Sequence, residues 1–377
     1  MAEDTAPETQ DASAELVAYI GTLTPETDST STIRSLLAAG ADVHARHELG
    51  ATVLHLAAAK GNQQAVTEIL RAGAQWNAID DASKSVGEYA RENGHEELYA
   101  FLVDEGVRTE FLLMALGASS TDAYEEEEDV EADEAEAPEL VQDAADVKLA
   151  SATPAAGQAS AHPSNADYLS RPLTFSEGRI LDADKNGVMM GWEEPLMERH
   201  AAVIAPTPGL SVLNVGFGLG LIDKALQRLK PAKHTIIEAH PDVYAQMLRE
   251  GWDKKPGVRI LFGRWQDVLG DLEAYDGIFF DTFGEYYDDL KAFHEHLPNI
   301  LNQDGIYSFF NGLAGTNPFF HDVACGLAEA DLREMGLETK YIELVVDELG
   351  DETWRGVRRP YYSLPIYRLP VCKFEEF

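Results

Sequence analysis

Residues 210–223 constrain the fold of this chain more than any other stretch of its sequence. An apolar run from Leu210 to Val215 is typical of a buried parallel strand, and three glycines follow, at positions 216, 218 and 220. After them, apolar residues recur at helical spacing as far as Leu229. A strand, a glycine-rich turn and a helix in this order predict the first unit of a nucleotide-binding α/β sheet. The glycines allow a sharp turn and the close approach of a ligand, although G-x-G-x-G alone is a weak indicator.

The next predicted unit strengthens this interpretation. A short strand from His234 to His240 carries an acid, Glu238, 22 residues after Gly216. A carboxylate at the end of the second strand reaches the two hydroxyls of an adenosine ribose. An ordinary α/β turn followed by a surface glutamate would contain the same residues. The order of strand, glycines, helix, strand and acid favours the nucleotide site.

Five further strands and a hairpin complete the predicted α/β domain. The strands are expected at 258–262, 275–281, 305–310, 340–346 and 361–369, and helices fill the gaps. Upstream, 173–175 and 187–190 are predicted as the arms of one hairpin around an Asn-Gly turn. A helix follows from about Glu194, with Pro195 in its first turn. Seven strands, the last pair after the alternating units, predict a class I (Rossmann-like) methyltransferase sheet rather than a six-stranded dinucleotide fold.

The N-terminal third of the chain contains a repeat of 33 residues. Gly40-Ala41 recurs as Gly73-Ala74, Gly61-Asn62 as Gly94-His95, and Ala57 as Ala90. With Thr52-Val-Leu-His-Leu-Ala57, this period predicts ankyrin repeats, about two full helix-loop-helix units plus partial ones, within an all-α domain at 31–115. His55 and His95 are expected to bond neighbouring loops. Because a repeat contacts mainly its own neighbours, the downstream domain is expected to remain whole without this module.

The domain boundaries follow from composition. Residues 1–30 are predicted to be an N-terminal tail. Residues 116–165 combine a dense acidic run, Glu125 to Glu139, with an Ala/Ser/Pro-rich stretch. Such a segment buries too little apolar surface to offset the entropy of ordering, so it is predicted to be a disordered linker. It could also be an acidic docking segment. The methyltransferase domain is predicted at 166–377.

Composition also limits the partners. A formal net charge of −37 argues against direct nucleic-acid binding and suits a basic protein partner. Two cysteines cannot make a disulfide framework, so a reducing compartment is expected. The acidic start has no apolar signal region, and no uninterrupted apolar run approaches the roughly 18 residues of a membrane span. The chain is therefore expected to be cytoplasmic and nuclear, without a membrane partner, and monomeric.

Residues 182–193 satisfy the calcium-loop template D-x-[DN]-x-[DN]-G-x₅-E in full. Such loops need an entering helix, and Pro172 and Gly178 oppose one. They also normally work in pairs, and the sequence has no second copy. The hairpin explains the same residues, so calcium binding is set aside and no metal site is expected.

Five motifs, in order along the chain, resemble guanidinoacetate methyltransferase: Met189-Met-Gly-Trp-Glu-Glu-Pro-Leu-Met197, Asn214-Val-Gly-Phe-Gly218, Ile237-Glu-Ala-His240, Gly263-Arg-Trp-Gln-Asp267 and Phe280-Asp-Thr-Phe283. With the ankyrin repeats, they make the chain similar to the fungal type IV protein arginine methyltransferases, the arginine N-methyltransferase 2 family. The resemblance covers 31–107 and 168–377. It implies transfer of a methyl group from S-adenosylmethionine to the internal (delta) guanidino nitrogen of arginine in a large-subunit ribosomal protein.

The resemblance also implies the site residues. Glu193 and Asp281 are the implied catalytic pair that binds the guanidinium, and Asp281 also touches the cofactor. Glu238 takes the ribose. The remaining implied cofactor contacts are Tyr168, Met197, Phe217, Gly218, Leu219, Gly220, Leu221, Ile222, Ala239, His240, Trp265 and Gln266. Asn311-Gly-Leu313 corresponds to a substrate-side loop.

Three positions depart from the family pattern. Asn214 replaces the usual acid before the first glycine, so a charge contact with the cofactor does not follow there. Gly191 replaces an Arg, and Glu194 a Thr, beside Glu193. A basic residue would hold the carboxylate of free guanidinoacetate, so these changes suit a larger substrate.

The chemistry of the residues leads to the same reaction. A guanidinium is planar, cationic and a poor nucleophile, and carboxylates bind it bidentately and fix its plane. Two of them can align one nitrogen with the activated methyl group, and positioning should give most of the acceleration. No metal and no nucleophilic Cys is needed, and the scattered histidines lack ligand spacing: His200, His294, His296 and His321. A small-molecule guanidino methyltransferase with an ankyrin adaptor and a non-catalytic ankyrin scaffold stay open as alternatives, although retention of Glu193, Glu238 and Asp281 speaks against the scaffold.

Overall fold

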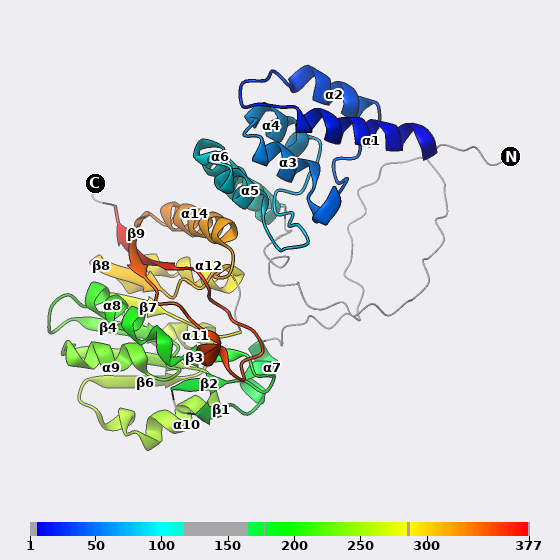
Figure 1. Cartoon of the computed structure of the whole chain (residues 1–377). Coiled ribbons are helices and arrows are strands. Elements are labelled where there is room, and N and C mark those ends of the chain that lie inside the picture. Colours follow the sequence, from blue (N-terminus) through cyan, green and yellow to red (C-terminus); the bar gives the residue numbers. More distant parts are fainter. Residues whose placement is uncertain (1–5, 117–164, 177, 285–286, 376–377) are drawn as a thin grey trace, which may run out of the picture.

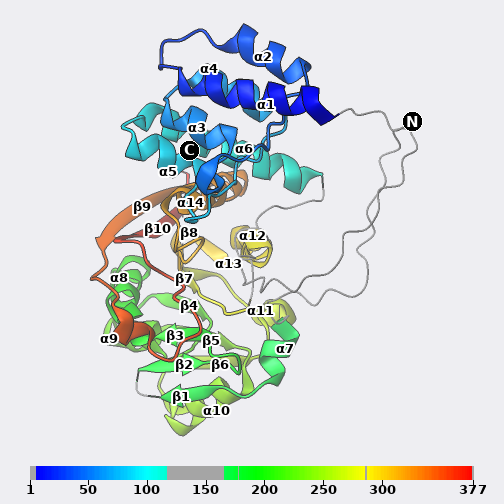
Figure 2. The same ribbon diagram turned by 45° about the vertical axis from the view of Figure 1, so that its right-hand side comes forward.

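The computed structural model describes residues 6–116, 165–176, 178–284 and 287–375. The linker predicted at 116–165 lies outside these residues except for its first and last positions. An N-terminal helical domain lies beside a C-terminal α/β domain (Figures 1 and 2). Among the described helices, none is long and apolar enough to cross a membrane.

The C-terminal domain is built on a seven-stranded sheet with the order β6-β5-β4-β7-β8-β10-β9. The first five strands in this order are parallel, and β10 runs antiparallel between β8 and β9. The bounds are β4 Ser211–Val215, β5 Lys233–Glu238, β6 Val258–Phe262, β7 Tyr275–Phe280, β8 Leu301–Phe309, β9 Leu337–Val345 and β10 Ile366–Phe374. The predicted seven-stranded methyltransferase sheet is confirmed. Its strand order reverses at β4, so the carboxyl ends of β4, β5 and β7 form a crevice where ligands bind in such sheets.

Helices cover both faces of this sheet because successive strand residues point to opposite sides. In β4, Val212 packs among residues of α8 and α9, whereas Leu213 packs among residues of α12 and α14. Pro195 occupies the first turn of α8, as predicted. The helices are α8 Glu194–Ile204, α9 Leu221–Arg228, α10 Pro241–Arg249, α11 Trp265–Val268, α12 Tyr287–His294, α13 Leu297–Ile300, α14 Pro318–Glu334 and α15 Asp351–Trp354.

The last strand is displaced from its predicted position at 361–369. Residues 361–365 are irregular, and β10 starts at Ile366 and continues through Pro370 to Phe374. A proline is normally excluded from a central strand because it has no N–H to donate. Here the Pro370 carbonyl accepts a hydrogen bond from the Ser308 side chain. This bond satisfies the Pro370 carbonyl, and the strand continues past its predicted end with Pro370 opposite Tyr341 of β9.

The predicted hairpin has one more strand than expected. β1 (Thr174–Ser176) and β3 (Gly187–Met190) do not pair with each other, since both pair with β2 (Arg179–Leu181) between them. Within the turn, Asp182 Oδ1 accepts from the backbone N–H groups of Asp184 and Asn186, both at 2.8 Å. The calcium-loop acids therefore close a β-hairpin turn.

The helical domain contains three helix pairs: α1 Ala6–Gly21 with α2 Thr30–Ala38, α3 Val53–Ala59 with α4 Gln63–Arg71, and α5 Val86–Glu92 with α6 Glu96–Ala115. The prediction that residues 1–30 form a tail is wrong, because α1 lies there. Its residues Ala12, Leu16 and Ile20 recur every four positions and are buried in the repeat core. The histidines behave as expected: His55 Nε2 lies 3.2 Å from the Lys84 carbonyl, and His95 Nε2 lies 3.2 Å from that of Ala59.

The two domains share one hydrophobic core across α14. Phe319, Phe320 and Val323 of α14 belong to the same buried cluster as the ankyrin residues. The Phe319 ring lies 5.9 Å from that of Trp76 and 5.7 Å from that of Tyr99. α14 accordingly lies between the ankyrin helices and the sheet (Figure 1). The repeats pack mainly on one another, as expected, but the last helix pair also packs against α14, which the sequence did not predict.

Candidate functional site

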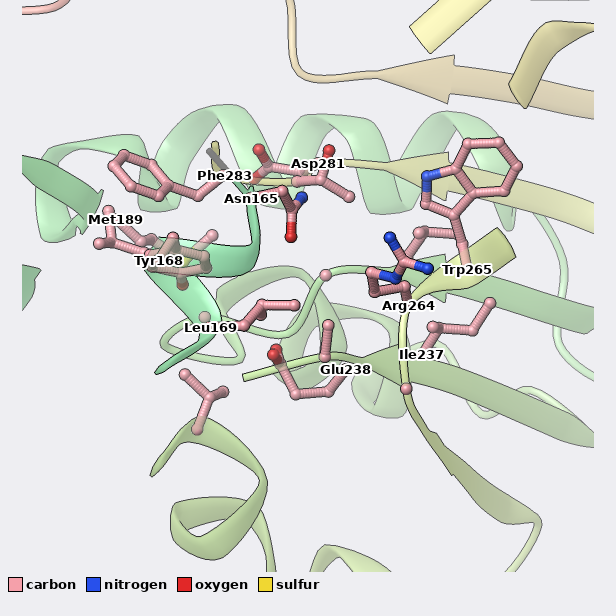
Figure 3. Close-up of a pocket in the computed structure, with 18 residues that line it drawn as sticks. Asn165, Tyr168, Leu169, Met189, Ile237, Glu238, Arg264, Trp265, Asp281 and Phe283 are labelled. Carbon is pink, nitrogen blue, oxygen red and sulfur yellow. The ribbon is translucent and has the colours of Figure 1, made fainter. Parts of the chain in front are cut away.

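A cavity opens at the carboxyl ends of β4, β5 and β7, beside α7 (Asn165–Ser170), and its empty space, together with the open solvent at its mouth, is about 600 Å³. In Figure 3, Glu238 and Asp281 approach the cavity from opposite sides, while Tyr168 and Met189 lie across from Arg264 and Trp265. The lining residues are Asn165, Tyr168, Leu169, Val188, Met189, Val215, Gly216, Gly218, Ile237, Glu238, Ala239, Val243, Gly263, Arg264, Trp265, Asp281, Thr282 and Phe283.

The glycine loop after β4 lets the backbone itself form one wall. Gly216 has a φ of 95°, and a Cβ there would lie 1.8 Å from the carbonyl oxygen of Asp281. A Cβ at Gly218 would lie 2.6 Å from Met189 Sδ. Neither position has room for a side chain, so the loop keeps β4 and β7 close and leaves the cavity open.

Glu238 ends β5 with its carboxylate buried against this loop. Oε2 accepts from the Phe217 N–H at 3.0 Å, and Oε1 accepts from the His240 N–H at 2.6 Å. Burial raises the pKa of Glu238 to about 7, although the backbone hydrogen bonds act in the opposite direction. A carboxylate has about four lone-pair sites, so these bonds leave acceptor capacity for a ligand in the cavity.

Two buried acceptors on the cavity wall have no hydrogen-bond partner among the described residues. They are Asp281 Oδ2, just after β7, and Asn165 Oδ1, at the start of α7. Burial raises the pKa of Asp281. Acceptors that are left without a protein partner at a cavity can accept hydrogen bonds from a ligand that binds there.

Glu193 lies in a short 3-10 turn, Gly191–Glu193, between β3 and α8, and does not line the cavity. Only 2% of it is exposed. Its Oε1 accepts from the Met190 N–H at 2.8 Å and from the Tyr361 hydroxyl. Burial raises the pKa of Glu193, and the nearby charge of Asp281 raises it further. The structure thus brings the two predicted carboxylates into electrostatic contact although 88 residues separate them in the sequence.

Tyr168 covers the cavity from α7 and is held there by its neighbours. Its ring lies 4.9 Å from the rings of His240 and Phe283. His240 Nε2 faces the carbonyls of Tyr168 at 3.2 Å and Arg171 at 3.0 Å, while its Nδ1 accepts from the Asp242 N–H. Nε2 therefore carries the proton, and His240 fixes α7 in place from behind instead of lining the cavity.

The predicted cofactor residues divide into two groups. Those that line the cavity are Tyr168, Gly218, Glu238, Ala239, Trp265 and Asp281. Those that do not are Met197, Phe217, Leu219, Gly220, Leu221, Ile222, His240 and Gln266. Met197 and Ile222 are buried in the core between α8 and α9, and the Phe217 ring packs 5.2 Å from Trp252. For this second group a cofactor contact stays a prediction.

Several lining residues were not predicted. Thr282 and Phe283 directly follow Asp281 in a motif that the sequence makes visible, and Gly263 and Arg264 directly precede Trp265. All four lie just after a strand, and this position could have identified them as site residues. Asn165 and Leu169 lie in α7, which begins at the last residue of the predicted linker, where no strand or motif marks them.

Asn214, one of the departures from the family pattern, and Asn311, a predicted substrate-side residue, both make buried hydrogen bonds. Asn214 Nδ2 donates to the Gly216 carbonyl at 2.8 Å and to Asp223 Oδ2 at 2.9 Å, so this side chain braces the glycine loop. Asn311, in the predicted substrate-side loop, is fully buried, and its Nδ2 donates to the Arg368 carbonyl at 2.9 Å. Neither side chain lines the cavity.

No group of metal-binding side chains is present in the parts of the chain that the structure describes. His200, one of the scattered histidines, is fully buried between Ser308 Oγ and the Tyr367 hydroxyl, each 2.8 Å away. Burial lowers the pKa of His200 to about 3, so the ring is neutral at ordinary pH. It joins α8, β8 and β10 as part of the core.

Two family profiles match this chain. The one described as guanidinoacetate N-methyltransferase matches residues 174–316, and the one described as ankyrin repeats (3 copies) matches residues 26–111. The second match begins between α1 and α2 and ends within α6.

Curated proteins resemble the chain over most of its length. A protein arginine N-methyltransferase 2 of Aspergillus oryzae is 42% identical over 328 residues, 81% of this chain and 76% of its own length. One of Emericella nidulans is 43% identical, covering 82% and 78%. One of Cryptococcus neoformans is 37% identical over 383 residues, covering 92% and 93%. These matches include both domains described above.

Proposed function

This chain belongs to the protein arginine N-methyltransferase 2 family, and from this premise we propose that it methylates the internal, delta nitrogen of an arginine in a large-subunit ribosomal protein. The chain is an S-adenosylmethionine-dependent methyltransferase with a class I sheet and ankyrin repeats. When bound, the cofactor supplies an activated methyl group on a cationic sulfur. The finer assignment, of nitrogen and substrate, is the proposal.

The cavity residues fit this cofactor. Glu238 offers a buried carboxylate for the ribose hydroxyls. Ile237 and Trp265 offer apolar surface for the adenine, and the Cβ-free wall at Gly216 and Gly218 admits the methionine part. The free acceptors of Asp281 and Asn165 suit its cationic groups. We expect all of these side-chain and backbone features to contribute to cofactor affinity.

The observation that carries the proposed substrate is the buried pair Glu193 and Asp281. Asp281 Oδ2 has no partner among the described residues, and the hydrogen bonds from Met190 and Tyr361 to Glu193 both reach its Oε1. Two desolvated carboxylates that repel each other are stabilised by a cation between them, because the cation relieves both burial and repulsion. A guanidinium satisfies both with directed N–H groups and is held in one plane.

The pair also supplies a proton acceptor. A guanidinium nitrogen that gains a methyl group must lose its proton, and Glu193 and Asp281 both have a raised pKa. A carboxylate with a raised pKa accepts a proton more readily near neutral pH. We therefore assign the two carboxylates to orienting the guanidinium and receiving the proton, and we expect positioning to dominate the acceleration.

We further propose that a basic protein substrate docks in part on the ankyrin repeats. The net charge of −37 supports this, because it attracts a basic partner over long range and disfavours nucleic acid. A steep increase of KM with salt would support electrostatic docking, and a KM independent of salt would oppose it. A monomer in the cytoplasm and nucleus belongs to the same proposal, and sedimentation together with cell imaging tests it.

The reaction itself is tested by locating the methyl group. The full-length chain is incubated with labelled S-adenosylmethionine and either purified large-subunit ribosomal proteins or guanidinoacetate. We expect label in a protein, and fragmentation by mass spectrometry should place the methyl group on the delta nitrogen. Label only in guanidinoacetate would favour a small-molecule enzyme. Cofactor binding without any transfer would favour a scaffold.

A further inference from the structure

A cluster of three aromatic side chains reaches Glu193 through the Tyr361 hydroxyl, outside the cofactor cavity. Tyr361 lies in the irregular segment before β10, and its ring centroid is 5.9 Å from that of Trp192 and 5.0 Å from that of Trp354. None of the three lines the cavity. The cluster is therefore in contact with the carboxylate assigned to the substrate but not with the cofactor site.

A chain of hydrogen bonds runs from this cluster to Glu193. Trp192 Nε1 donates to the Tyr361 hydroxyl at 3.2 Å, and that hydroxyl donates to Glu193 Oε1. The Met190 N–H also donates to Oε1, at 2.8 Å. Both donors are on the same oxygen. Neither of these two donors reaches Oε2, so we assign Oε2 to the substrate.

The tyrosine is itself firmly placed. A Cβ at Gly187 would lie 2.9 Å from the Tyr361 ring, so β3 closely approaches one of its edges. On either side of it, the Arg358 N–H donates to the Lys185 carbonyl at 2.8 Å and the Ser363 N–H donates to that of Gly315 at 2.9 Å. The segment is attached both to the β2–β3 turn and to the loop after β8. The hydroxyl therefore meets Glu193 in a defined direction.

We propose that Tyr361 is a positioning residue for methyl transfer: its hydroxyl holds Glu193 so that Oε2 is presented to the substrate guanidinium. This inference rests on the proposed role of Glu193. Tyr361 acts through Glu193 and does not touch the cofactor. Because an arginine side chain must be aligned within a fraction of an ångström for in-line transfer, a carboxylate free to rotate would align it poorly.

The protonation states support this arrangement. Burial raises the pKa of Tyr361 well above its ordinary value, so the hydroxyl remains a donor across the working pH range. Its hydrogen bond lowers the pKa of Glu193, against the larger effect of burial. The other titratable groups whose charges act on Glu193 or respond to it are Asp281, after β7, and Tyr367, in β10. Removing the hydroxyl should raise the pKa of Glu193.

The test compares Tyr361→Phe with Tyr362→Phe in the full-length enzyme, using the unmethylated form of the ribosomal protein that the enzyme modifies as the assay substrate. Each variant loses one hydroxyl, but that of Tyr362 donates to the Ile366 carbonyl instead of to Glu193. We expect kcat/KM for the protein to fall about 10- to 100-fold in Tyr361→Phe, as for loss of a hydrogen bond to a charged group. We expect the acid limb of its pH–rate profile to move toward higher pH. Cofactor affinity by calorimetry should stay within about twofold of wild type, and Tyr362→Phe should match wild type in all three.

A double variant separates positioning from a general structural effect. If Tyr361 acts through Glu193, Tyr361→Phe should cost little once Glu193→Gln is present, since neighbouring groups that act together are not additive. Losses that multiply in the double variant would overturn the proposal, as would a Tyr361→Phe enzyme with wild-type kinetics and an unchanged pH profile. A Glu193→Gln enzyme at the wild-type rate would instead refute the proposed function.

If Tyr361→Phe does not fold, Trp192→Phe removes the donor to the same hydroxyl and should shift the pH profile in the same direction. An unshifted profile there would overturn the proposal.

Discussion

Among the residues of the site, burial controls the charge of the carboxylates more than any hydrogen bond does. Glu193, Glu238 and Asp281 all have a raised pKa because each is desolvated. A ligand that needs them ionised must therefore bind more tightly as the pH rises through these values. This links cofactor and substrate binding to pH in a direction that experiment can check.

For Glu238 we expect cofactor affinity to increase between about pH 6 and pH 8, since its pKa is raised to about 7 and the ionised form accepts the ribose hydroxyls more strongly. Calorimetric titrations at several pH values measure this. Glu238→Ala should lower the affinity at least about tenfold at pH 8, because hydrogen bonds to a charged group contribute roughly 1.5–3 kcal/mol each. Asp253→Ala serves as the control, because it removes a negative charge at an exposed position instead of at the buried Glu238. Unchanged affinity in Glu238→Ala would exclude this acid as the ribose ligand.

For the substrate pair we expect two different results. Glu193→Gln keeps the size of the side chain and removes its charge, so methyl transfer should fall about 10²- to 10⁴-fold while cofactor affinity barely changes. Asp281→Asn should lower both, because Asp281 lines the cavity and has an oxygen without a partner among the described residues. Single-turnover rates and calorimetry distinguish these results. Normal cofactor binding by a folded Asp281→Asn enzyme would contradict the second.

At the scale of elements, the contact between β4 and β7 depends on a missing side chain. Gly216→Ala would place a Cβ 1.8 Å from the Asp281 carbonyl and would strain a φ of 95°. Gly209→Ala is a matched control, because Gly209 has a φ of 87° and open space around its missing Cβ. The control should lose only about 1–2 kcal/mol of stability from backbone strain. Gly216→Ala should lose clearly more and should also bind cofactor poorly. Equal thermal midpoints for the two variants would show that the clash is relieved.

Sequence patterns predicted the elements whose signals are local. The spacing of apolar residues, the glycines and Pro195 correctly predicted helix α8 and the strands near 211–215, 233–238 and 275–280. β10 was predicted at 361–369 but runs through Pro370 to Phe374, and a proline is normally excluded from a central strand. α1 was missed because its three buried residues carry no repeat signature.

The site could be predicted only in part, for the same reason. Glu238 and Asp281 end strands and are visible in the sequence. The contact between Glu193 and Tyr361 joins residues 168 positions apart, and no spacing rule connects them. Asn165 lies beside the cavity because α7 returns to it, which depends on tertiary packing by His240.

At the scale of the whole molecule, the shared core makes the two domains one cooperative unit. Phe319 is fully buried, and a Cβ at Gly87 would lie 2.1 Å from its ring. Phe319→Ala should cost about 3–5 kcal/mol and lower the unfolding temperature of both domains together. We expect a single calorimetric transition for the full chain. Two separate transitions, of which only one moves in Phe319→Ala, would contradict this. Phe175→Ala, at a side chain 38% exposed, should change the midpoint little.

Removal of the repeats tests the same interface from the other side. A chain that begins at residue 117 exposes Phe319, Phe320 and Val323 to water and loses the bond from the Tyr99 hydroxyl to Asp322 at 2.6 Å. We expect it to aggregate or to unfold at a lower temperature, even though its sheet is complete. Light scattering and circular dichroism measure both outcomes. A soluble fragment with an unchanged midpoint of thermal unfolding would show that α14 does not need the ankyrin helices to cover its apolar residues.

The late position of α14 in the sequence also affects how the protein folds during its synthesis. The ankyrin helices leave the ribosome about 200 residues before Phe319 and Phe320 do, which at a typical elongation rate is an interval of roughly 10–40 s. During that interval Trp76 and Tyr99 face water on the surface that α14 later covers. The nascent repeats therefore expose this apolar surface to water until α14 has been synthesised. Translation speed and chaperone supply, more than the stability of the finished protein, should limit how much of it a cell can produce.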